Sequence, residues 1–265
     1  MHVRDQPMEQ ARQLIADADR LSRMPGGSAT IAPPMGLAAT AMVFGLFSVS
    51  LWLTVAAVIP WLRDSYGISS IFGWYLSGTV VVLAPILMFG SAMAWLELPA
   101  PTLSEWRRRL RLVPINRGDA VWTIVGLFVI AAASAAILAL ARHLDPGFQP
   151  SPSFLAQSPG WNARVFAAWI PLFVANILGE ELCWRGYVLP RQEAAWGPSA
   201  WLANGIPWCL FHWSFGWPIL LMLLPITLLL PWIVQRRRNT SVGIIIHAVF
   251  NAAGFVLATS ALGAP

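Results

Sequence analysis

Long apolar runs, separated by short polar or proline-rich stretches, dominate this chain. Several runs reach the roughly 18–20 residues that an α-helix needs to cross a bilayer. The predicted spans are 35–62, 69–96, 120–140, 163–189, 200–215, 219–234 and 240–262. This pattern predicts an all-α, polytopic helical membrane protein with about seven transmembrane spans, within a range of six to eight.

The stretches between the runs predict the connections. Short turns are expected at 63–67 and 190–198. The amphipathic, arginine-rich stretch 98–118 is expected to lie at the membrane surface. Pro85 is expected to kink the second span, because proline lacks the N–H that an interior helix position needs.

The first 33 residues are polar and differ from the rest of the chain. We therefore divide the sequence into a cytoplasmic N-terminal segment, 1–33, and a transmembrane domain, 34–265. Apolar residues within 8–21 share one helical face, which fits both an amphipathic helix at the membrane surface and a solvated tail. No apolar run begins the chain, so no cleavable signal peptide is expected.

Composition agrees with a membrane protein, and charge adds an orientation. The chain is 57% hydrophobic and only 11% charged, with a formal net charge of +5. All basic residues are arginines, and most fall in stretches that share one side when the N-terminus is cytoplasmic. They cluster beside the spans, so the lipid bilayer is the expected partner and nucleic acid is not. Abundant Ala, Pro and Trp without Lys indicate a bacterial genome, and hence a bacterial plasma membrane.

Three charged residues lie inside the fourth predicted span. Glu180, Glu181 and Arg185 fall within 163–189. A charged side chain at the centre of a bilayer costs at least ~2.5–3.5 kcal/mol, so each needs a partner. Glu181 and Arg185 are spaced i,i+4 with the acid first, which favours an ion pair. Glu180 lies roughly 100° further round the helix and is predicted to face something else.

Other polar residues recur one helical turn apart on three spans. The sets are Asn176 with Glu180, then Asn204 with Trp208 and His212, then His247 with Asn251. Polar stripes are costly against lipid, so they are expected to converge on one interior cavity. Counting from the arginine-rich ends places this cavity in the inner half of the bilayer.

This constellation leaves four chemistries open. A desolvated glutamate can activate water for hydrolysis, and two histidines with a glutamate form a reasonable metal-ligand set. A polar cavity can also carry protons or ions, or only fix the packing of helices. No His-Glu-x-x-His motif is present, and neither a metal nor another cofactor is predicted. Cys183 and Cys209 are interpreted as reduced, buried thiols.

The order of the motifs resembles the CPBP intramembrane protease family, which includes the type II CAAX prenyl endopeptidases and bacteriocin-processing or immunity relatives. The resemblance rests on Glu180-Glu181-Leu-Cys-Trp-Arg185, then His212, then His247-x-x-x-Asn251, and covers 163–258. It implies a multi-span α-helical membrane protein that acts as a glutamate-dependent protease. Residues 1–162 match no motif of the family.

The resemblance also implies roles for single residues. Glu180 corresponds to the base that activates water, and His212 corresponds to the residue that positions this water. His247 and Asn251 correspond to the pair that stabilises the oxyanion. All four positions are intact.

The resemblance assigns supporting roles to Glu181 and Arg185. The second family motif is usually Phe-x-x-x-His, and Trp208 takes the place of its phenylalanine here. This is the one departure, and it keeps an aromatic side chain one turn before His212.

The function expected from these residues is an intramembrane endopeptidase whose site opens to the cytoplasmic half of the membrane. Prenylated CAAX substrates are a eukaryotic speciality. A bacterial chain is therefore expected to act on another protein or peptide, associated with the membrane. The alternative is a non-proteolytic membrane scaffold or bacteriocin-immunity protein, in which the same residues only hold helices together.

Overall fold

The computed structural model describes residues 32–155 and 163–262, and all the regular elements in these ranges are helices. Contacts divide the chain into two units, Met1–Pro33 and Pro34–Pro265. The surface helix or tail expected in 1–33 lies outside the described residues. Everything that follows concerns the second unit.

Among the described residues, five helical stretches are long and apolar enough to cross a membrane: Leu37–Tyr66, Ser70–Leu96, Arg117–Leu144, Ala163–Phe215 and Trp217–Arg237. A shorter apolar helix is Thr240–Val256. The chain is therefore an all-α, multi-pass membrane protein, as predicted. The predicted fourth and fifth spans both lie in one long helical stretch, Ala163–Phe215. Within it the chain turns at Gly197, whose φ is 55°.

The first half of the unit contains three long helical stretches and one short helix. Its elements are α2 (Leu37–Leu53), η1 (Thr54–Val58), α3 (Ile59–Tyr66), α4 (Ser70–Ser77), η2 (Gly78–Leu83), α5 (Ala84–Leu96), α6 (Leu103–Arg109) and α7 (Arg117–Leu144). The predicted turn at 63–67 is wrong, because α3 continues to Tyr66 and ends at Gly67, whose φ is 67°. The surface stretch 98–118 contains the short helix α6.

The second half carries the motif residues. Its elements are η3 (Ser153–Leu155), α8 (Ala163–Glu180), η4 (Glu181–Val188), α9 (Leu189–Trp196), η5 (Gly197–Ser199), α10 (Ala200–Phe211), η6 (Trp213–Phe215), α11 (Trp217–Arg237) and α12 (Thr240–Leu262). The predicted turn at 190–198 is wrong, because α9 follows η4 directly and continues to Trp196, with Pro190 in its first turn. With the helix ending at Trp196, Glu180 lies near the middle of the run from Ala163 and not clearly in its inner half.

Three π-helical segments, η1, η2 and η4, each end just before a helix with proline in its first turn. The prolines are Pro60, Pro85 and Pro190. A proline ring clashes with the carbonyl one turn earlier, and a widened turn relieves this clash. Just before Pro85, where a kink was predicted, the structure has the π-helical segment η2. Other prolines, such as Pro225 and Pro231, lie inside an α-helix without such a segment.

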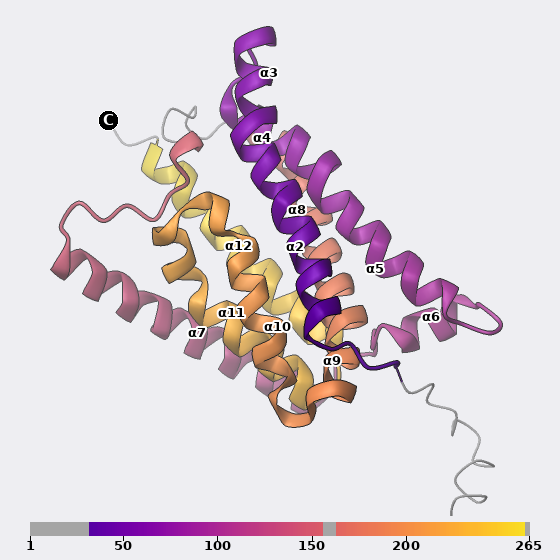
Figure 1. Cartoon of the computed structure of the whole chain (residues 1–265). Coiled ribbons are helices and arrows are strands. Elements are labelled where there is room, and N and C mark those ends of the chain that lie inside the picture. The colour runs from indigo at the N-terminus through magenta and orange to yellow at the C-terminus, as the bar shows by residue number, and fades with distance from the viewer. Residues whose placement is uncertain (1–31, 156–162, 263–265) are drawn as a thin grey trace, which may run out of the picture. The chain divides into compact units, whose positions relative to one another are not determined.

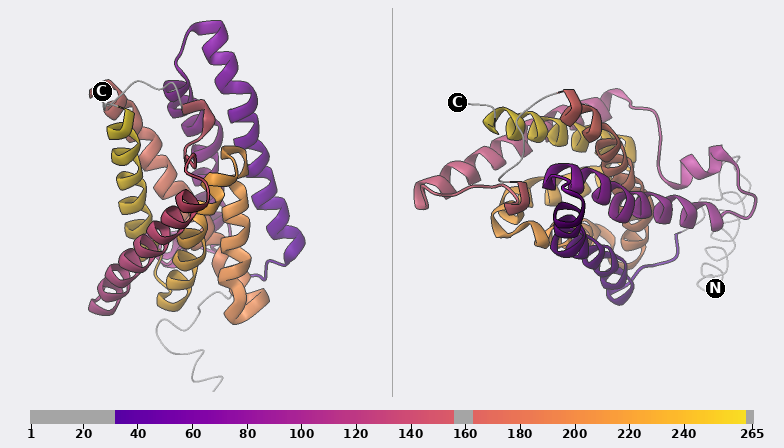
Figure 2. Two further views of the ribbon diagram at one scale, coloured as in Figure 1. Left: turned by 90° about the vertical axis from the view of Figure 1, so that its left-hand side faces the viewer. Right: turned by 90° about the horizontal axis from the view of Figure 1, so that it is seen from above.

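The helices form one bundle in which the motif helices are central. Figure 1 shows α2, α5 and α8 along one side, and α7 with α11 and α12 on the other. The segment η4 packs on α5, while α10 lies against α2 and α11. The two further views in Figure 2 show the same bundle from the side and from above. The motif stretch is thus enclosed by helices from both halves of the chain.

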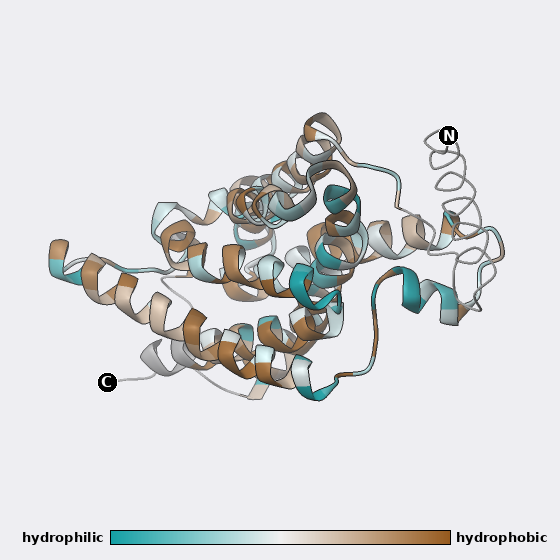
Figure 3. Cartoon of the chain, turned by 90° about the horizontal axis from the view of Figure 1, so that it is seen from below, coloured by the Kyte–Doolittle hydropathy of each residue, from teal (hydrophilic) through white to brown (hydrophobic). Residues whose placement is uncertain are grey.

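Apolar side chains cover the outside of the bundle as well as its inside. Figure 3 shows α7 as hydrophobic for most of its length and hydrophilic at its start, and α6 as hydrophilic. Phe128 on α7 is 74% exposed. Apolar surface of this extent is costly in water but not against lipid.

Ion pairs hold the arginine-rich end of the bundle together. Glu97, just past α5, accepts hydrogen bonds from Arg109 (2.9 Å), Arg191 and the Tyr187 hydroxyl (3.1 Å). Burial by itself raises the pKa of Glu97, but the hydrogen bonds and charges of the two arginines outweigh it, so this pKa lies below its ordinary value. The arginines at this end therefore join helices to one another, in addition to the topological role predicted for them.

Two more acidic residues complete this arrangement. Asp119 pairs with Arg237 at 2.8 Å and also caps α7 together with Asn116. The carboxylate of Glu193 on α9 accepts hydrogen bonds from both terminal nitrogens of Arg111, at 2.8 and 2.6 Å. The ends of α7, α9 and α11 are thereby fixed by paired charges.

Close packing of α5 on η4 predicts the effect of a single methyl group. A Cβ at Gly90 would lie 2.6 Å from the Cα of Cys183, whereas a Cβ at Gly45 meets nothing within 4 Å. We expect Gly90→Ala to lower the free energy of unfolding by about 1–3 kcal/mol through overpacking. Gly45→Ala should be neutral or stabilising by up to about 1 kcal/mol. Thermal unfolding of the purified protein in detergent measures both, and equal effects would contradict the packing.

The Glu97 cluster predicts a loss of stability in acid. A carboxyl whose folded pKa lies below its unfolded value stabilises the fold above that unfolded value, and the contribution is lost as pH falls through the folded pKa. The stability difference between wild type and Glu97→Gln should therefore be full at pH 7 and shrink below about pH 4.5. Unfolding measured across this pH range tests it. A difference that stays constant into strong acid would be inconsistent with paired arginines at Glu97.

Candidate active site

The two adjacent glutamates are both buried, with 1% exposure for Glu180 and 0% for Glu181. Glu180 ends α8 and Glu181 begins η4, so their side chains leave the helix in different directions. Each carboxylate meets different partners. This difference defines the chemistry of the region.

Glu181 contacts an arginine and a histidine. Its Oε1 lies 3.2 Å from Nη1 of Arg185, which confirms the predicted i,i+4 ion pair. The same oxygen lies 2.9 Å from Nδ1 of His247 on α12. Arg185 is itself fully buried. Glu181 therefore joins η4 to α12 and shares its charge with two groups that can be positive.

Glu180 is held by neutral donors. Its Oε1 accepts a hydrogen bond of 2.7 Å from Nδ2 of Asn176, one turn earlier on α8. Its Oε2 accepts one from the indole N–H of Trp208 on α10. Asn176 in turn accepts a 2.8 Å hydrogen bond from Nδ2 of Asn251 on α12. Hydrogen bonds thus connect Glu180 to residues on α8, α10 and α12. The contact between Asn176 and Asn251 agrees with the expected convergence of their polar stripes.

His212 is the C-cap residue of α10 and is half-buried. Its Nδ1 lies 2.9 Å from the backbone oxygen of Trp208. A carbonyl oxygen only accepts, so Nδ1 carries the hydrogen and donates. The hydrogen bond leaves Nε2 of the neutral ring as an acceptor.

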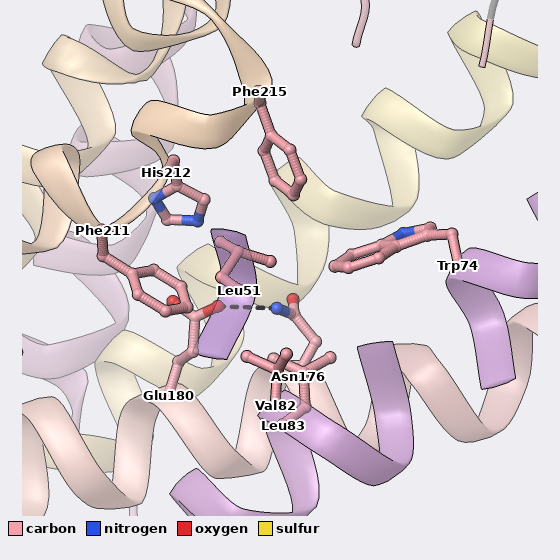
Figure 4. A pocket seen from close by; sticks show the side chains of 9 residues that line it. All are labelled: Leu51, Trp74, Val82, Leu83, Asn176, Glu180, Phe211, His212 and Phe215. Carbon is pink, nitrogen blue, oxygen red and sulfur yellow. Dashed lines mark hydrogen bonds between the residues drawn. The ribbon is translucent and has the colours of Figure 1, made fainter. Parts of the chain in front are cut away.

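A small pocket brings Glu180 and His212 together. Figure 4 shows their side chains, with Asn176, beside an otherwise apolar wall. The wall consists of Leu51, Trp74, Val82, Leu83, Phe211 and Phe215. The site therefore has few polar groups in apolar surroundings, as is typical of sites that bind small or extended ligands.

Two residues with expected oxyanion roles, His247 and Asn251, are not among the described lining residues of this pocket, and neither is Trp208. Asn251 reaches Glu180 through Asn176. The His247 ring lies 5.4 Å, centre to centre, from that of Trp208.

Asn204 does not point to the pocket, although it shares a predicted stripe with Trp208 and His212. Its Nδ2 donates to the backbone oxygen of Trp184 (3.0 Å) and to Oε1 of Gln192 (2.9 Å). Gln192, which has 0% exposure, was missed in the sequence because it falls in the predicted turn. Asn204 therefore joins α10 to η4 and α9.

The cysteines are outside this constellation of polar groups. Cys183 and Cys209 are both free and buried, as predicted. Within residues 32–155 and 163–262, no group of three or more His, Cys, Asp and Glu side chains is arranged to hold a metal ion.

Comparison with known families agrees with the motif positions. Residues 162–253 match the family described as Type II CAAX prenyl endopeptidase Rce1-like. This segment is Rce1-like. The match confirms the family resemblance predicted from the three motifs, and the Rce1-like segment contains Glu180, His212, His247 and Asn251. No curated protein and no solved structure matches the chain.

The Rce1-like segment covers only the second half of the site. Leu51, Trp74, Val82 and Leu83 line the same pocket but precede the matched residues. They are apolar residues in apolar runs, so no sequence signal distinguishes them from the rest of their helices.

The buried ion pair predicts a large stability effect for Arg185→Ala. Removing one partner leaves Glu181 charged and buried, which costs about 3–5 kcal/mol. The exposed pair Arg63–Asp64, with side chains 56% and 64% exposed, is the matched control. Arg63→Ala should leave the unfolding temperature nearly unchanged, because an ion pair in solvent contributes little. Thermal unfolding of the two variants measures the contrast, and similar losses would refute a structural role for the buried pair.

Proposed function

We propose that this protein is an intramembrane endopeptidase that hydrolyses a peptide bond with water activated by Glu180. One observation carries the proposal: a buried carboxylate and an imidazole with a free acceptor nitrogen line the same small pocket inside an apolar bundle. The Rce1-like match supports the class of reaction, since that family is described as endopeptidases.

In this proposal, Glu180 is the general base. Each carboxylate oxygen accepts one hydrogen bond from the protein and keeps capacity for a second one, from water. Nε2 of His212 accepts the other hydrogen of the same water. A water held in this way directs a lone pair at a substrate carbonyl in the pocket.

The reaction then balances within the site. The water oxygen bonds to the carbonyl carbon, its proton moves to Glu180, and the carbonyl oxygen becomes an oxyanion. When the C–N bond breaks, Glu180 returns this proton to the leaving nitrogen. As the oxyanion re-forms the carbonyl, the products are a carboxylic acid and an amine, and the acid then releases its proton to solvent.

The proposed oxyanion donors are Asn251 and His247. Nδ2 of Asn251 keeps one N–H beyond the one given to Asn176. Nδ1 of His247 lies 2.9 Å from Oε1 of Glu181, so its Nε2 is the ring nitrogen proposed to face the oxyanion. Neither donor is a described lining residue of the pocket, so the proposal requires both to approach the oxyanion when substrate binds.

The proposed substrate is a protein or peptide associated with the membrane. The apolar wall of the pocket and the lipid-facing surface of the bundle support this class. We place the protein in the plasma membrane of a bacterium, because its basic residues are all arginines and because it has helices long enough to span a membrane.

The test compares peptide termini in cells that carry wild type, Glu180→Ala or Glu180→Gln at matched abundance. Loss of a general base lowers a rate by about 10²–10⁴-fold, so new termini made by wild type should fall to background in both variants. Glu105→Gln, which changes an acid on α6, should leave them unchanged. Mass spectrometry of membrane and secreted peptides gives the readout.

If cells that carry Glu180→Ala still produce the same peptide termini, the proposed mechanism is wrong. A variant phenotype without any change in termini would favour the scaffold or immunity function. Thermal unfolding of the Glu180 variants shows whether lost cleavage reflects lost chemistry or lost folding.

A further inference from the structure

Trp208 contacts more of the polar site than any of the four residues with expected catalytic roles. Its indole N–H donates to Oε2 of Glu180, and its backbone oxygen accepts from Nδ1 of His212 at 2.9 Å. The Arg185 guanidinium carbon lies 3.4 Å from the centre of its ring, and the His247 ring lies 5.4 Å away. One residue, 2% exposed, thus connects the general base, its positioning partner and the buried ion pair.

We propose that Trp208 is a positioning residue that fixes the Glu180 carboxylate and the His212 imidazole relative to each other. The inference rests on the proposed function, because it concerns the water that these two groups hold. Its physical basis is that the two orienting hydrogen bonds come from a single residue, one from the side chain and one from the backbone.

Two donors from different helices define the orientation of the carboxylate. Asn176 holds Oε1 from the helix that carries Glu180, and Trp208 holds Oε2 from α10. With one donor alone, the carboxylate can rotate about its last bond. The second donor restricts this rotation and keeps the free lone pairs directed at one water site.

The indole ring is itself held in place. Arg185 stacks on its face, a geometry that stabilises a cation on an aromatic ring and is strongest for tryptophan. The Arg185–Glu181 pair therefore supports Glu180 through Trp208, without touching the pocket. This links the supporting residues to the reacting groups by contacts present in the structure.

The departure from the Phe-x-x-x-His motif acquires a chemical meaning here. A phenylalanine at 208 keeps an aromatic face for Arg185 and the backbone oxygen for His212. It has no N–H, so it cannot hold Glu180. Trp208→Phe thus removes this hydrogen bond, together with the part of the buried indole that a phenyl ring does not fill.

The experiment measures kcat and KM of Trp208→Phe on a quenched-fluorescent peptide built around a cleavage site found by the comparison of termini. A hydrogen bond to a charged group is worth a factor of about 10–100, so kcat should fall by this factor. KM should stay within about twofold. Because Trp208 is buried, the smaller ring also leaves a cavity that lowers the unfolding temperature, so kcat is measured where the variant is folded. A purely structural role would raise KM or lower the unfolding temperature and leave kcat of the folded variant as in wild type.

Trp106→Phe is the matched control. Trp106 lies on α6 and is not a described lining residue of the pocket. Its indole N–H donates to the backbone oxygen of Ser91 at 3.0 Å. The same chemical change there should leave kcat as in wild type. A kcat of Trp208→Phe within twofold of wild type would overturn the inference, as would an equal loss in Trp106→Phe.

Glu180→Ala, measured in the same assay, separates the two proposals. If it still cleaves the peptide, the proposed mechanism fails, and the role of Trp208 fails with it. If it is inactive while Trp208→Phe is fully active, only the positioning role fails.

Discussion

Two adjacent carboxylates buried in an apolar bundle are the constraint on which the rest of the site depends. A buried charge is tolerated only when charge or hydrogen bonds replace the lost water. Glu181 contacts the Arg185 guanidinium and the His247 imidazole, and Glu180 takes the neutral donors of Asn176 and Trp208. Because these partners sit on α8, η4, α10 and α12, satisfying the two carboxylates requires these elements to meet.

The unequal treatment of the two glutamates separates structure from chemistry. Glu181 ends with its charge balanced, and it serves as a joint between η4 and α12. Glu180 lines a pocket, and the hydrogen bonds described for its carboxylate come from neutral groups. A second set of ion pairs, around Glu97, Asp119 and Glu193, fixes the arginine-rich ends of the same helices. Two sets of paired charge therefore fix the helices that carry the proposed reacting groups.

The sequence predicts the parts of this arrangement that follow from periodicity. The i,i+4 pair of Glu181 and Arg185, the contact of Asn176 with Glu180 and the limits of the last helix all agree with the structure. Spacing along one helix fixes these contacts. It also places Asn204 on the correct face of α10, but a face is wide enough to meet two neighbours, and Asn204 turns to Gln192.

Other features could not be predicted from the sequence, for physical reasons. Proline was taken as a sign of a turn at 190–198, yet Pro190 fits the first turn of α9. Leu51 and Trp74 line the pocket through long-range packing, which local sequence does not encode. The indole hydrogen bond of Trp208 depends on where α10 lies against α8, so the motif alone shows only an aromatic residue.

The π-helical segment η4, Glu181–Val188, has a consequence for related sequences. A π turn holds one residue more than an α turn, so a deletion there can be absorbed by rewinding to α-helix, with both flanks kept in phase. Chains that share this bundle can therefore differ by a residue between the glutamate pair and Pro190, and alignments that forbid gaps inside helices will misplace one side of the site.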